Sequence, residues 1–417
     1  MPFLFPPSLS HTYTNTRPDT THAQFRRSQS MSTQKISSRR GLWLGILISF
    51  VLVSLIGGVL WTFRASSFNS ILPERFFEPL LKVQGVKLAP TPPARVKTDE
   101  EIASYVVSLD ILSHRPFHSK SFKIAFMFLT RGPLPHEHIW ERFFKGHESM
   151  YSVFVHASEE GHSRISPIFM GRDIWSKKVF WGKIDMIDAE RRLLANALLD
   201  KDNKYFVLLS ESCIPLWDFN YIYEHLSNSS ISYVDCFYDP GPHGAGRYLD
   251  GMKPEVQHSD FHKGAQWFAV HRQHALLILA DSLYYRKFKE FCKPGDANRN
   301  CYPDEHYVQT LLHIIDPQGI SNWSVTYVDW TDQKAHPRSF HAGDINLSLL
   351  EKIKNITVSS HVTSDLKKLE TKQPCLWNGV KYPCYLFARK FSADSSNHLE
   401  AILFNNAHQS ADQPIRE

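Results

Sequence analysis

The chain has 417 residues, of which 42% are hydrophobic and 13% are aromatic. That content is sufficient to bury a large core, which excludes a protein that is disordered over most of its length. The formal net charge is only +5, from 47 basic and 42 acidic side chains, and no long basic run lies inside the probable domain. Nucleic acid is therefore not expected as a partner.

An uncharged apolar segment lies near the N-terminus at residues 41–63, with the sequence GLWLGILISFVLVSLIGGVLWTF. A helix of this length crosses the hydrocarbon core of a bilayer, so we expect a transmembrane signal anchor. Arg39 and Arg40 precede it directly, and this positive flank predicts a disordered cytoplasmic tail at residues 1–40, with the rest of the chain luminal. A cleaved signal peptide is the alternative, but its apolar region would be shorter. Met31 is an alternative start of the chain.

Cysteines and glycosylation sequons support a luminal location for the remainder. All six cysteines follow the apolar segment: Cys213, Cys236, Cys292, Cys301, Cys375 and Cys384. The last four form two pairs that each bracket a short loop, which predicts two local disulfides, with buried free thiols as the alternative. Four Asn-x-Ser/Thr sequons are candidate glycosylation sites: Asn228, Asn322, Asn346 and Asn355.

The region after the anchor divides into three parts. Residues 64–118 contain a proline-rich stretch and have weak periodicity, so we expect them to form a luminal stem. Residues 119–405 are expected to form the folded domain, and residues 406–417 a C-terminal tail.

Buried strands alternate with helices at the start of the domain. Continuous apolar runs predict strands at residues 123–130, 151–157 and 205–210, and helical spacing predicts helices at 138–147 and 185–200. This alternation indicates an α/β fold with a mostly parallel sheet that is covered by helices. Further strands are predicted at 231–238, 265–271 and 325–330, and further helices at 273–291 and 303–315.

Ligands of an open α/β sheet bind at the carboxyl ends of its strands, which points to the loops at residues 130–135, 156–161 and 210–217. None of them contains a GxGxxG or P-loop pattern, so the usual dinucleotide and nucleoside-triphosphate cradles are excluded. The third loop has the sequence SESCIPL, and Glu211 is its only carboxylate. Many sugar-nucleotide transferases have Asp-x-Asp here to hold a divalent metal; a metal clamp of that type is not encoded.

Seven motifs occur in order along the domain: KIAFMFLTRGPLP, YSVFVHASEE, YFVLLSESCIPL, KGAQWFAVHR, CYPDEHYVQTLL, VDWTDQKAHPRSF and CYLFARKF. Together they resemble the core-2/I-branching N-acetylglucosaminyltransferase family, glycosyltransferase family 14, and especially its plant-type branch, over residues 120–405. The resemblance implies a GT-A-like fold and a type II Golgi membrane enzyme. It also implies inverting transfer of a sugar, N-acetylglucosamine in the first instance, from a UDP-sugar to a glycan or glycoprotein acceptor, without a metal or other cofactor.

The motif PDEHY contains two candidates for a general base, Asp304 and Glu305. Inverting transfer needs a group that takes the proton from the attacking hydroxyl, and a carboxylate in a cleft suits that task. Because Pro303 favours a helix start here, the sequence alone leaves open that both carboxylates only complement the helix dipole. The resemblance implies that Glu305 is the base and that Asp304 has a structural role.

A diphosphate leaving group without a metal needs fixed cations. The candidates are Arg131, Arg338, Lys381, Arg389 and Lys390. The resemblance implies that Lys390 is the phosphate-binding lysine. Lys381 lies where the family has an arginine, and a lysine provides a point charge in place of a bidentate fork. Arg338 or Arg389 is the expected compensation.

The resemblance also implies acceptor contacts, made by Trp330 through the face of its ring and by Arg247. The family motif His-Val-Asp is replaced by His156-Ala157-Ser158, so an acidic contact to the nucleoside is lost. The identity of the donor is therefore left open. The segment HSDFH contains His258, Asp260 and His262, but spacing alone does not identify a metal site and we interpret it as a loop.

Two further functions are compatible with these residues. Ser158 stands where the family has an acidic residue. The loss of that acidic contact is compatible with a catalytically inactive, membrane-anchored glycan-binding or scaffold protein, because a fold does not establish a function. The same fold using UDP-xylose or UDP-glucuronate is the other alternative.

Overall fold

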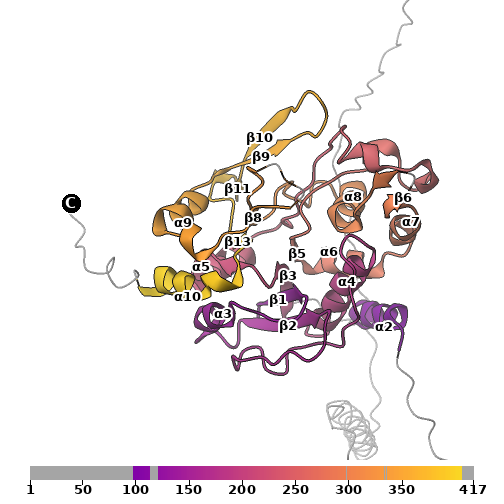
Figure 1. Ribbon diagram of the computed structural model, residues 1–417. Helices are drawn as coiled ribbons and strands as arrows, with labels where there is room; N and C mark the ends of the chain where they lie inside the picture. Colours follow the sequence, from indigo (N-terminus) through magenta and orange to yellow (C-terminus); the bar gives the residue numbers. More distant parts are fainter. Residues whose placement is uncertain (1–96, 113–120, 297, 333, 335, 406–417) are drawn as a thin grey trace, which may run out of the picture. The chain divides into compact units, whose positions relative to one another are not determined.

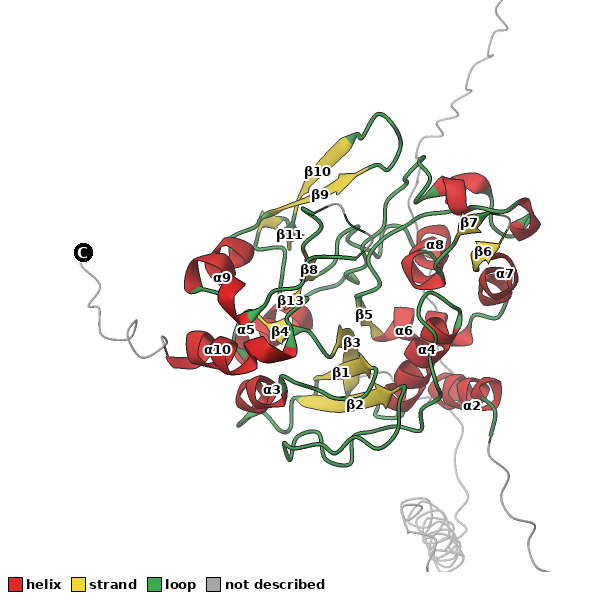
Figure 2. Cartoon of the chain, viewed as in Figure 1, coloured by secondary structure: helices red, strands yellow, loops and turns green. Residues whose placement is uncertain are grey.

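The computed structural model describes residues 97–112, 121–296, 298–332, 334 and 336–405 (Figures 1 and 2). They belong to one compact unit, Arg95–Glu417. The apolar segment 41–63 and both expected tails lie outside the described residues. Among the helices within them, none has the length and apolar character needed to cross a membrane.

A four-stranded sheet with the order β2-β1-β3-β5 lies at the centre (Figure 1). The strands are β1 (Lys123–Thr130), β2 (Tyr151–Ala157), β3 (Asn203–Ser210) and β5 (Ala269–His271). β1 pairs in parallel with both β2 and β3, whereas β5 pairs antiparallel with β3. The predicted parallel core is confirmed, but β5 makes the sheet mixed.

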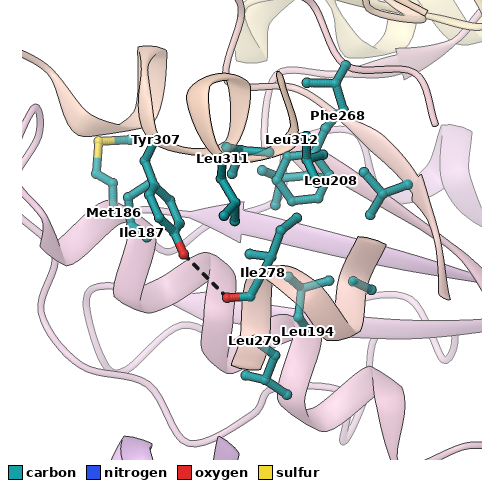
Figure 3. Packing of buried hydrophobic residues seen from close by; sticks show 14 of the residues in the cluster. Met186, Ile187, Leu194, Leu208, Phe268, Ile278, Leu279, Tyr307, Leu311 and Leu312 are labelled. Carbon is teal, nitrogen blue, oxygen red and sulfur yellow. Dashed lines mark hydrogen bonds between the residues drawn. The ribbon is translucent and has the colours of Figure 1, made fainter. Parts of the chain in front are cut away.

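Alternate side chains of β1 enter two different cores. Ala125, Met127 and Leu129 face a cluster that includes residues of α4 (Asp185–Leu198), α6 (Arg272–Ala280) and α8 (Tyr307–Ile315). Ile124, Phe126 and Phe128 face a second cluster with α3 (Glu137–Phe144) and α5 (Phe219–Ser227). Figure 3 shows the first cluster, in which the Tyr307 hydroxyl donates to the Ile278 carbonyl oxygen at 3.4 Å. The sheet is therefore covered by helices on both faces.

The helix predicted at residues 273–291 is two helices, α6 and α7 (Leu283–Phe291). The reason is Asp281, whose carboxylate accepts hydrogen bonds from the backbone amides of Leu283, Tyr284 and Tyr285 at 2.7–3.1 Å. A side chain that satisfies the first amides of a helix begins a new helix there. The helix predicted at 303–315 similarly begins as a 3₁₀ turn, Pro303–Glu305, before α8.

The predicted strand at residues 231–238 is absent as a regular strand, since this segment makes only isolated bridges such as Phe237 to Lys263. Next to that bridge the Asp235 carboxylate accepts the Ala265 amide at 2.7 Å, so a side chain replaces a ladder bond. A second sheet has the order β4-β13-β8. Its strands are β4 (Ile214–Pro215), β13 (Phe387–Arg389) and β8 (Thr326–Val328).

Small hairpins and helices complete the unit. The hairpins are β6 (Pro294–Asp296) with β7 (Arg299–Asn300), β9 (Val358–Val362) with β10 (Glu370–Pro374), and β11 (Leu376–Trp377) with β12 (Val380–Lys381). The remaining helices are α9 (Leu347–Lys354) and α10 (Ser396–Glu400). Disulfides join Cys292 to Cys301 and Cys375 to Cys384, while Cys213 and Cys236 are free and buried.

Helix α2 (Asp99–Leu112) lies inside the segment assigned to a stem, but it packs on the domain. It buries Ala103 and Val106 in the first core. The Asp99 carboxylate accepts two hydrogen bonds from Arg192, at 2.8 and 3.0 Å, and Asp110 pairs with Arg272 at 2.6 Å. The folded unit therefore begins before residue 119.

Candidate active site

Glu305 ends the 3₁₀ turn that precedes α8, and its carboxylate pairs with Arg247. The distance from Arg247 Nη1 to Glu305 Oε2 is 2.5 Å. The Glu305 side chain remains 27% exposed, whereas Arg247 is 7% exposed. The arginine stabilises the ionised carboxylate, and the other oxygen, Oε1, has no hydrogen-bond partner within the described part of the chain. Glu305 is thus a fixed carboxylate with one oxygen available.

His306 supports Arg247 from the buried side. Its Nδ1 is 2.8 Å from the His262 carbonyl oxygen and its Nε2 is 3.2 Å from Arg247 Nη1. Burial, followed by the positive charge of Arg247, lowers the pKa of His306 well below its ordinary value. A neutral ring that donates from Nδ1 accepts at Nε2, so His306 orients the guanidinium toward Glu305.

Asp304 has a different environment from its neighbour. It is buried, its Oδ1 has no hydrogen-bond partner among the described residues, and its negative charge raises the pKa of the nearby Glu190. Burial, with a further contribution from the charge of Glu305, raises the pKa of Asp304 to about 7. Asp304 lies in the 3₁₀ turn directly before α8, which begins at Tyr307. Asp304 is a buried acid behind the candidate base.

Lys263 is a second cation beside Glu305 and was not predicted from the sequence. Burial lowers the pKa of Lys263, and the negative charge of Glu305 opposes that effect. The following residue, Gly264, donates its amide to the Glu305 carbonyl oxygen at 2.9 Å. A Cβ at Gly264 would lie 1.8 Å from the Asp235 carbonyl oxygen, so only glycine allows this close approach. The motif KGAQW therefore forms one wall of the site.

Aromatic rings continue from Arg247 toward the surface. The guanidinium lies 4.7 Å from the centre of the Tyr302 ring, which is 5.0 Å from Trp181, and Trp181 is 5.3 Å from His336. His336 lies in the loop after β8 that also carries Trp330, which is 50% exposed. Exposed rings with polar neighbours suit the faces of a sugar.

Three loops converge at the carboxyl ends of β1 and β3. The Phe391 amide donates to the Ser212 carbonyl oxygen at 3.0 Å, and the Phe391 carbonyl oxygen is 3.2 Å from Nε2 of His136. This contact brings Arg389, the last residue of β13, and the following residue, Lys390, close to the SESCIPL loop. The expected position of the diphosphate thus has cations at the end of β13.

Lys390 and Arg389 differ in availability. Lys390 is half-buried, and its ammonium has no hydrogen bond or ion pair with any residue that the structure describes. The Arg389 guanidinium is stacked 4.3 Å above the Trp267 ring, and its Nε has no hydrogen-bond partner in the described part of the chain. Burial lowers the pKa of Arg389. Of these two side chains, only Lys390 has a charged group with no partner among the described residues.

The remaining basic candidates have other contacts. Arg338 pairs with Asp344 at 3.3 Å on the surface, and Arg131, which is 84% exposed, pairs with Glu159 at 3.1 Å. Lys381 is exposed on the β11–β12 hairpin, which binds α5 through the hydrogen bond from Trp377 to the His225 carbonyl oxygen. These contacts do not connect Lys381 to the surroundings of Glu305.

A pocket of about 560 Å³ lies next to Arg247 in the chain. Its lining includes Ala245, Tyr248, His258 and Arg299, but not Glu305. Among the residues proposed from the sequence for donor or acceptor binding, none lines this pocket. It is a hollow beside the site and not the site itself.

The family assignment follows from comparison with known proteins. The sequence model of the family described as Branch: Core-2/I-Branching enzyme matches residues 124–354. The chain belongs to the Core-2/I-Branching enzyme family. It is also 35% identical over 311 residues to "Glycosyltransferase BC10" from Oryza sativa subsp. japonica, an alignment that covers 66% of this chain and 75% of the relative. The resemblance found in the motifs is confirmed, and sugar transfer is the activity class.

Ser158, the departure from the Core-2/I-Branching pattern, has a structural role here. Its hydroxyl accepts the Val179 amide at 2.8 Å and its own amide donates to the Thr130 carbonyl oxygen at 3.0 Å. The serine thus fixes the loop that leads to Trp181. In this member of the family, the position orders the rim of the site.

The sequons differ in exposure. Three of them are exposed: Asn228, Asn346 and Asn355. Asn322 is half-buried, and the Trp323 and Ser324 of its sequon are buried. The three exposed asparagines are therefore the stronger candidates for glycosylation.

Proposed function

We propose that this chain is a type II Golgi membrane glycosyltransferase that transfers a sugar, N-acetylglucosamine in the first instance, from a UDP-sugar to a glycan hydroxyl with inversion. The observation that carries the proposal is the arrangement of Glu305, with one oxygen held by Arg247 and the other without a partner among the residues that the structure describes. Membership of the Core-2/I-Branching family supports the transfer of a sugar to a glycan.

Glu305 acts as the general base in this proposal. The acceptor oxygen attacks the anomeric carbon while Glu305 takes the hydroxyl proton and the bond from that carbon to the diphosphate oxygen breaks. Arg247 and His306 hold the carboxylate in place, so little reorganisation accompanies the proton transfer. UDP leaves with the negative charge that develops on its diphosphate.

Lys390 stabilises the leaving diphosphate in this proposal, because its ammonium has no partner among the described residues and the next residue, Phe391, is hydrogen-bonded to Ser212 of the SESCIPL loop. Ser210 and Ser212 hydrogen-bond to each other at 2.9 Å in that loop, and Glu211 is its only carboxylate. One carboxylate is a weak ligand set for a divalent metal, so the proposed mechanism uses a fixed cation. Trp330 and the ring of Trp181 offer faces to the acceptor or donor sugar.

A donor screen tests the proposal. The purified protein is incubated with UDP-N-acetylglucosamine, UDP-xylose and UDP-glucuronate, with glycan acceptors, and transfer and hydrolysis are measured with EDTA or with added Mn²⁺. We expect transfer from one donor that survives EDTA. Loss of activity that Mn²⁺ restores would contradict the role of Lys390. Glycan binding without turnover of any donor would favour the inactive alternative. That alternative is supported by Ser158, which stands where the family has an acidic residue.

A further inference from the structure

A cysteine and two histidines that have no part in the proposed reaction face one another behind the site. The Sγ atom of Cys236 and one ring nitrogen of each of His262 and His313 all lie within 4.8 Å of one another. They come from three segments: the bridge region before Phe237, the loop after the 3₁₀ turn His258–Asp260, and the last turn of α8. These ligand types converge from residues far apart in the sequence.

The geometry is close to that of a metal site. With metal–sulfur distances of about 2.3 Å and metal–nitrogen distances of about 2.0–2.1 Å, tetrahedral ligand atoms lie about 3.3–3.8 Å apart. Atoms that lie up to 4.8 Å apart therefore need to approach by about 1–1.5 Å, which rotation of the side chains provides. The two imidazole rings are stacked with their centres 3.6 Å apart, so at least one ring must turn for both nitrogens to point at a common ion.

Each member has its coordinating atom available. His262 Nδ1 is 2.9 Å from the Asp260 carbonyl oxygen, so it carries the proton and leaves the lone pair on Nε2. Metal-binding histidines usually donate their second nitrogen to a carbonyl in this way. Cys236 forms no disulfide, and its sulfur has only a 3.6 Å contact with the Gln309 carbonyl oxygen. The site is buried at Cys236 and His262 and half-open at His313.

We propose that Cys236, His262 and His313 bind one zinc ion, with a water molecule as the fourth ligand at the half-open side. A thiolate with two imidazoles suits a borderline-soft divalent ion that prefers four ligands. Binding releases the thiol proton of Cys236 and changes no oxidation state. The buried Oε1 of Gln309, one helical turn before His313, has no hydrogen-bond partner among the described residues.

The proposed ion positions the base and does not touch the substrate. The His262 carbonyl oxygen accepts from His306, His306 supports Arg247, and Arg247 holds Glu305. The His262 amide also donates to Thr310 Oγ1 of α8 at 3.1 Å. An ion that joins His262 to His313 therefore fixes this loop against α8. The base, Glu305, lies in the 3₁₀ turn directly before that helix.

The test uses metal content and spectroscopy on the purified full-length chain. Zinc is measured per chain after dialysis, and Co²⁺ is then exchanged into the protein. We expect about one zinc ion and a cobalt–thiolate charge-transfer band. Both should be lost in Cys236→Ser, and His313→Gln should weaken zinc binding by about 100-fold, since the loss of a direct ligand exceeds the usual effect of an outer partner. Because His313 is only half-buried, that variant tests the site even if Cys236→Ser does not fold.

Two matched variants serve as controls. His258→Gln changes an exposed histidine of the same segment, and Cys213→Ser removes the other free thiol, so both should keep the zinc and the cobalt band. Absence of zinc, equal binding by wild type and His313→Gln, or binding of Cu⁺ alone would overturn the proposal. If EDTA does lower the activity, recovery with Zn²⁺ but not Mn²⁺ supports this site, whereas recovery with Mn²⁺ indicates a diphosphate clamp. The binding test does not depend on activity, so its result is separate from that of the proposed reaction.

Discussion

Asp304 and Glu305 are adjacent carboxyl groups with opposite surroundings. Glu305 is partly exposed and paired with Arg247, whereas Asp304 is buried without a cation partner. The backbone of a 3₁₀ turn directs consecutive side chains to different sides, which separates a base from a buried acid. Substitution of each residue therefore has a different expected effect.

Glu305→Gln tests the base. Glutamine keeps the size of the side chain and a hydrogen-bond acceptor for Arg247, but it cannot take a proton. We expect turnover to fall by roughly 10²-fold or more, with UDP-sugar binding close to normal. Asp304→Asn, measured in parallel, should reduce turnover much less. Steady-state kinetics and donor titration give both values, and an unchanged turnover of Glu305→Gln on the true acceptor would remove this residue from the mechanism.

The pH dependence of stability tests Asp304. The pKa of Asp304 is about 7 in the folded protein, whereas the ordinary value for an aspartate side chain is 3.8. Between these values the folded chain binds the proton more tightly than the unfolded chain, so stability falls as the pH rises through this window. Relative to Asp304→Asn, the wild type should lose about 1–3 kcal/mol between pH 5 and pH 8. Urea unfolding at both pH values measures this difference; parallel behaviour of the two proteins would show that Asp304 does not titrate there.

Lys390→Ala and Lys381→Ala form a matched pair for the leaving group. Both remove one ammonium, but only Lys390 lies beside the SESCIPL loop, while Lys381 is on the β11–β12 hairpin. Loss of a hydrogen bond to a charged group costs about 1.5–3 kcal/mol, so Lys390→Ala should lower kcat/KM by about 10- to 100-fold. Lys381→Ala should be close to wild type. A larger loss in Lys381→Ala would restore the role that the family pattern implies for that position.

At the scale of elements, the sequence predicts best where one short-range signal decides the outcome. The bounds of β1 and β2 agree with the prediction because each is a largely apolar run; β1 is buried on both faces, and β2 buries mainly one face, with Tyr151, Val153 and Val155. The strand predicted at 231–238 failed because a side chain, Asp235, took the place of a backbone ladder bond. The partner of that bond is 30 residues away, so no local pattern shows it.

The site was predictable in its parts but not in its connections. Glu305 and Lys390 were selected from motifs, yet the pairing of Arg247 with Glu305 joins residues 58 apart. The position of Lys263 beside Glu305 was not predicted, because in the sequence Lys263 is only a basic residue before a glycine. Helix α2 was missed because only Ala103 and Val106 form its buried stripe, and its ion pair with Arg192 spans 93 residues.

Helix α2 should be required for the stability of the domain. A protein fragment that starts at residue 119 lacks the carboxylates of Asp99 and Asp110, which leaves Arg192 and Arg272 with less compensation for their burial. We expect this fragment to be insoluble or to unfold at a lower temperature than a fragment that starts at residue 95.

A point variant tests the same contact more finely. Asp99→Asn should destabilise the longer fragment by about 1–3 kcal/mol, less than a fully buried pair because Asp99 is partly exposed. Glu100→Gln, in the same exposed helical turn, should have no measurable effect. Equal melting temperatures for the two fragments would show that α2 does not stabilise the domain and belongs to the stem.

At the scale of the whole molecule, two independent features bear on the compartment of the domain. Two disulfides are formed, and three sequons present an exposed asparagine. Both features fit an oxidising, glycosylating compartment. The orientation itself is expected from Arg39 and Arg40 before the apolar segment 41–63.

Protease protection tests that orientation. In sealed secretory vesicles, added protease should remove only the tail before residue 41, because the domain is enclosed by the membrane. Removal of N-glycans should lower the apparent mass, and replacement of Asn228, Asn346 and Asn355 by Gln should abolish most of that shift. Detergent provides the control, since it should make the domain accessible to protease. Digestion of the domain in intact vesicles, or a mass that does not respond to the glycosidase, would place the domain on the other side of the membrane.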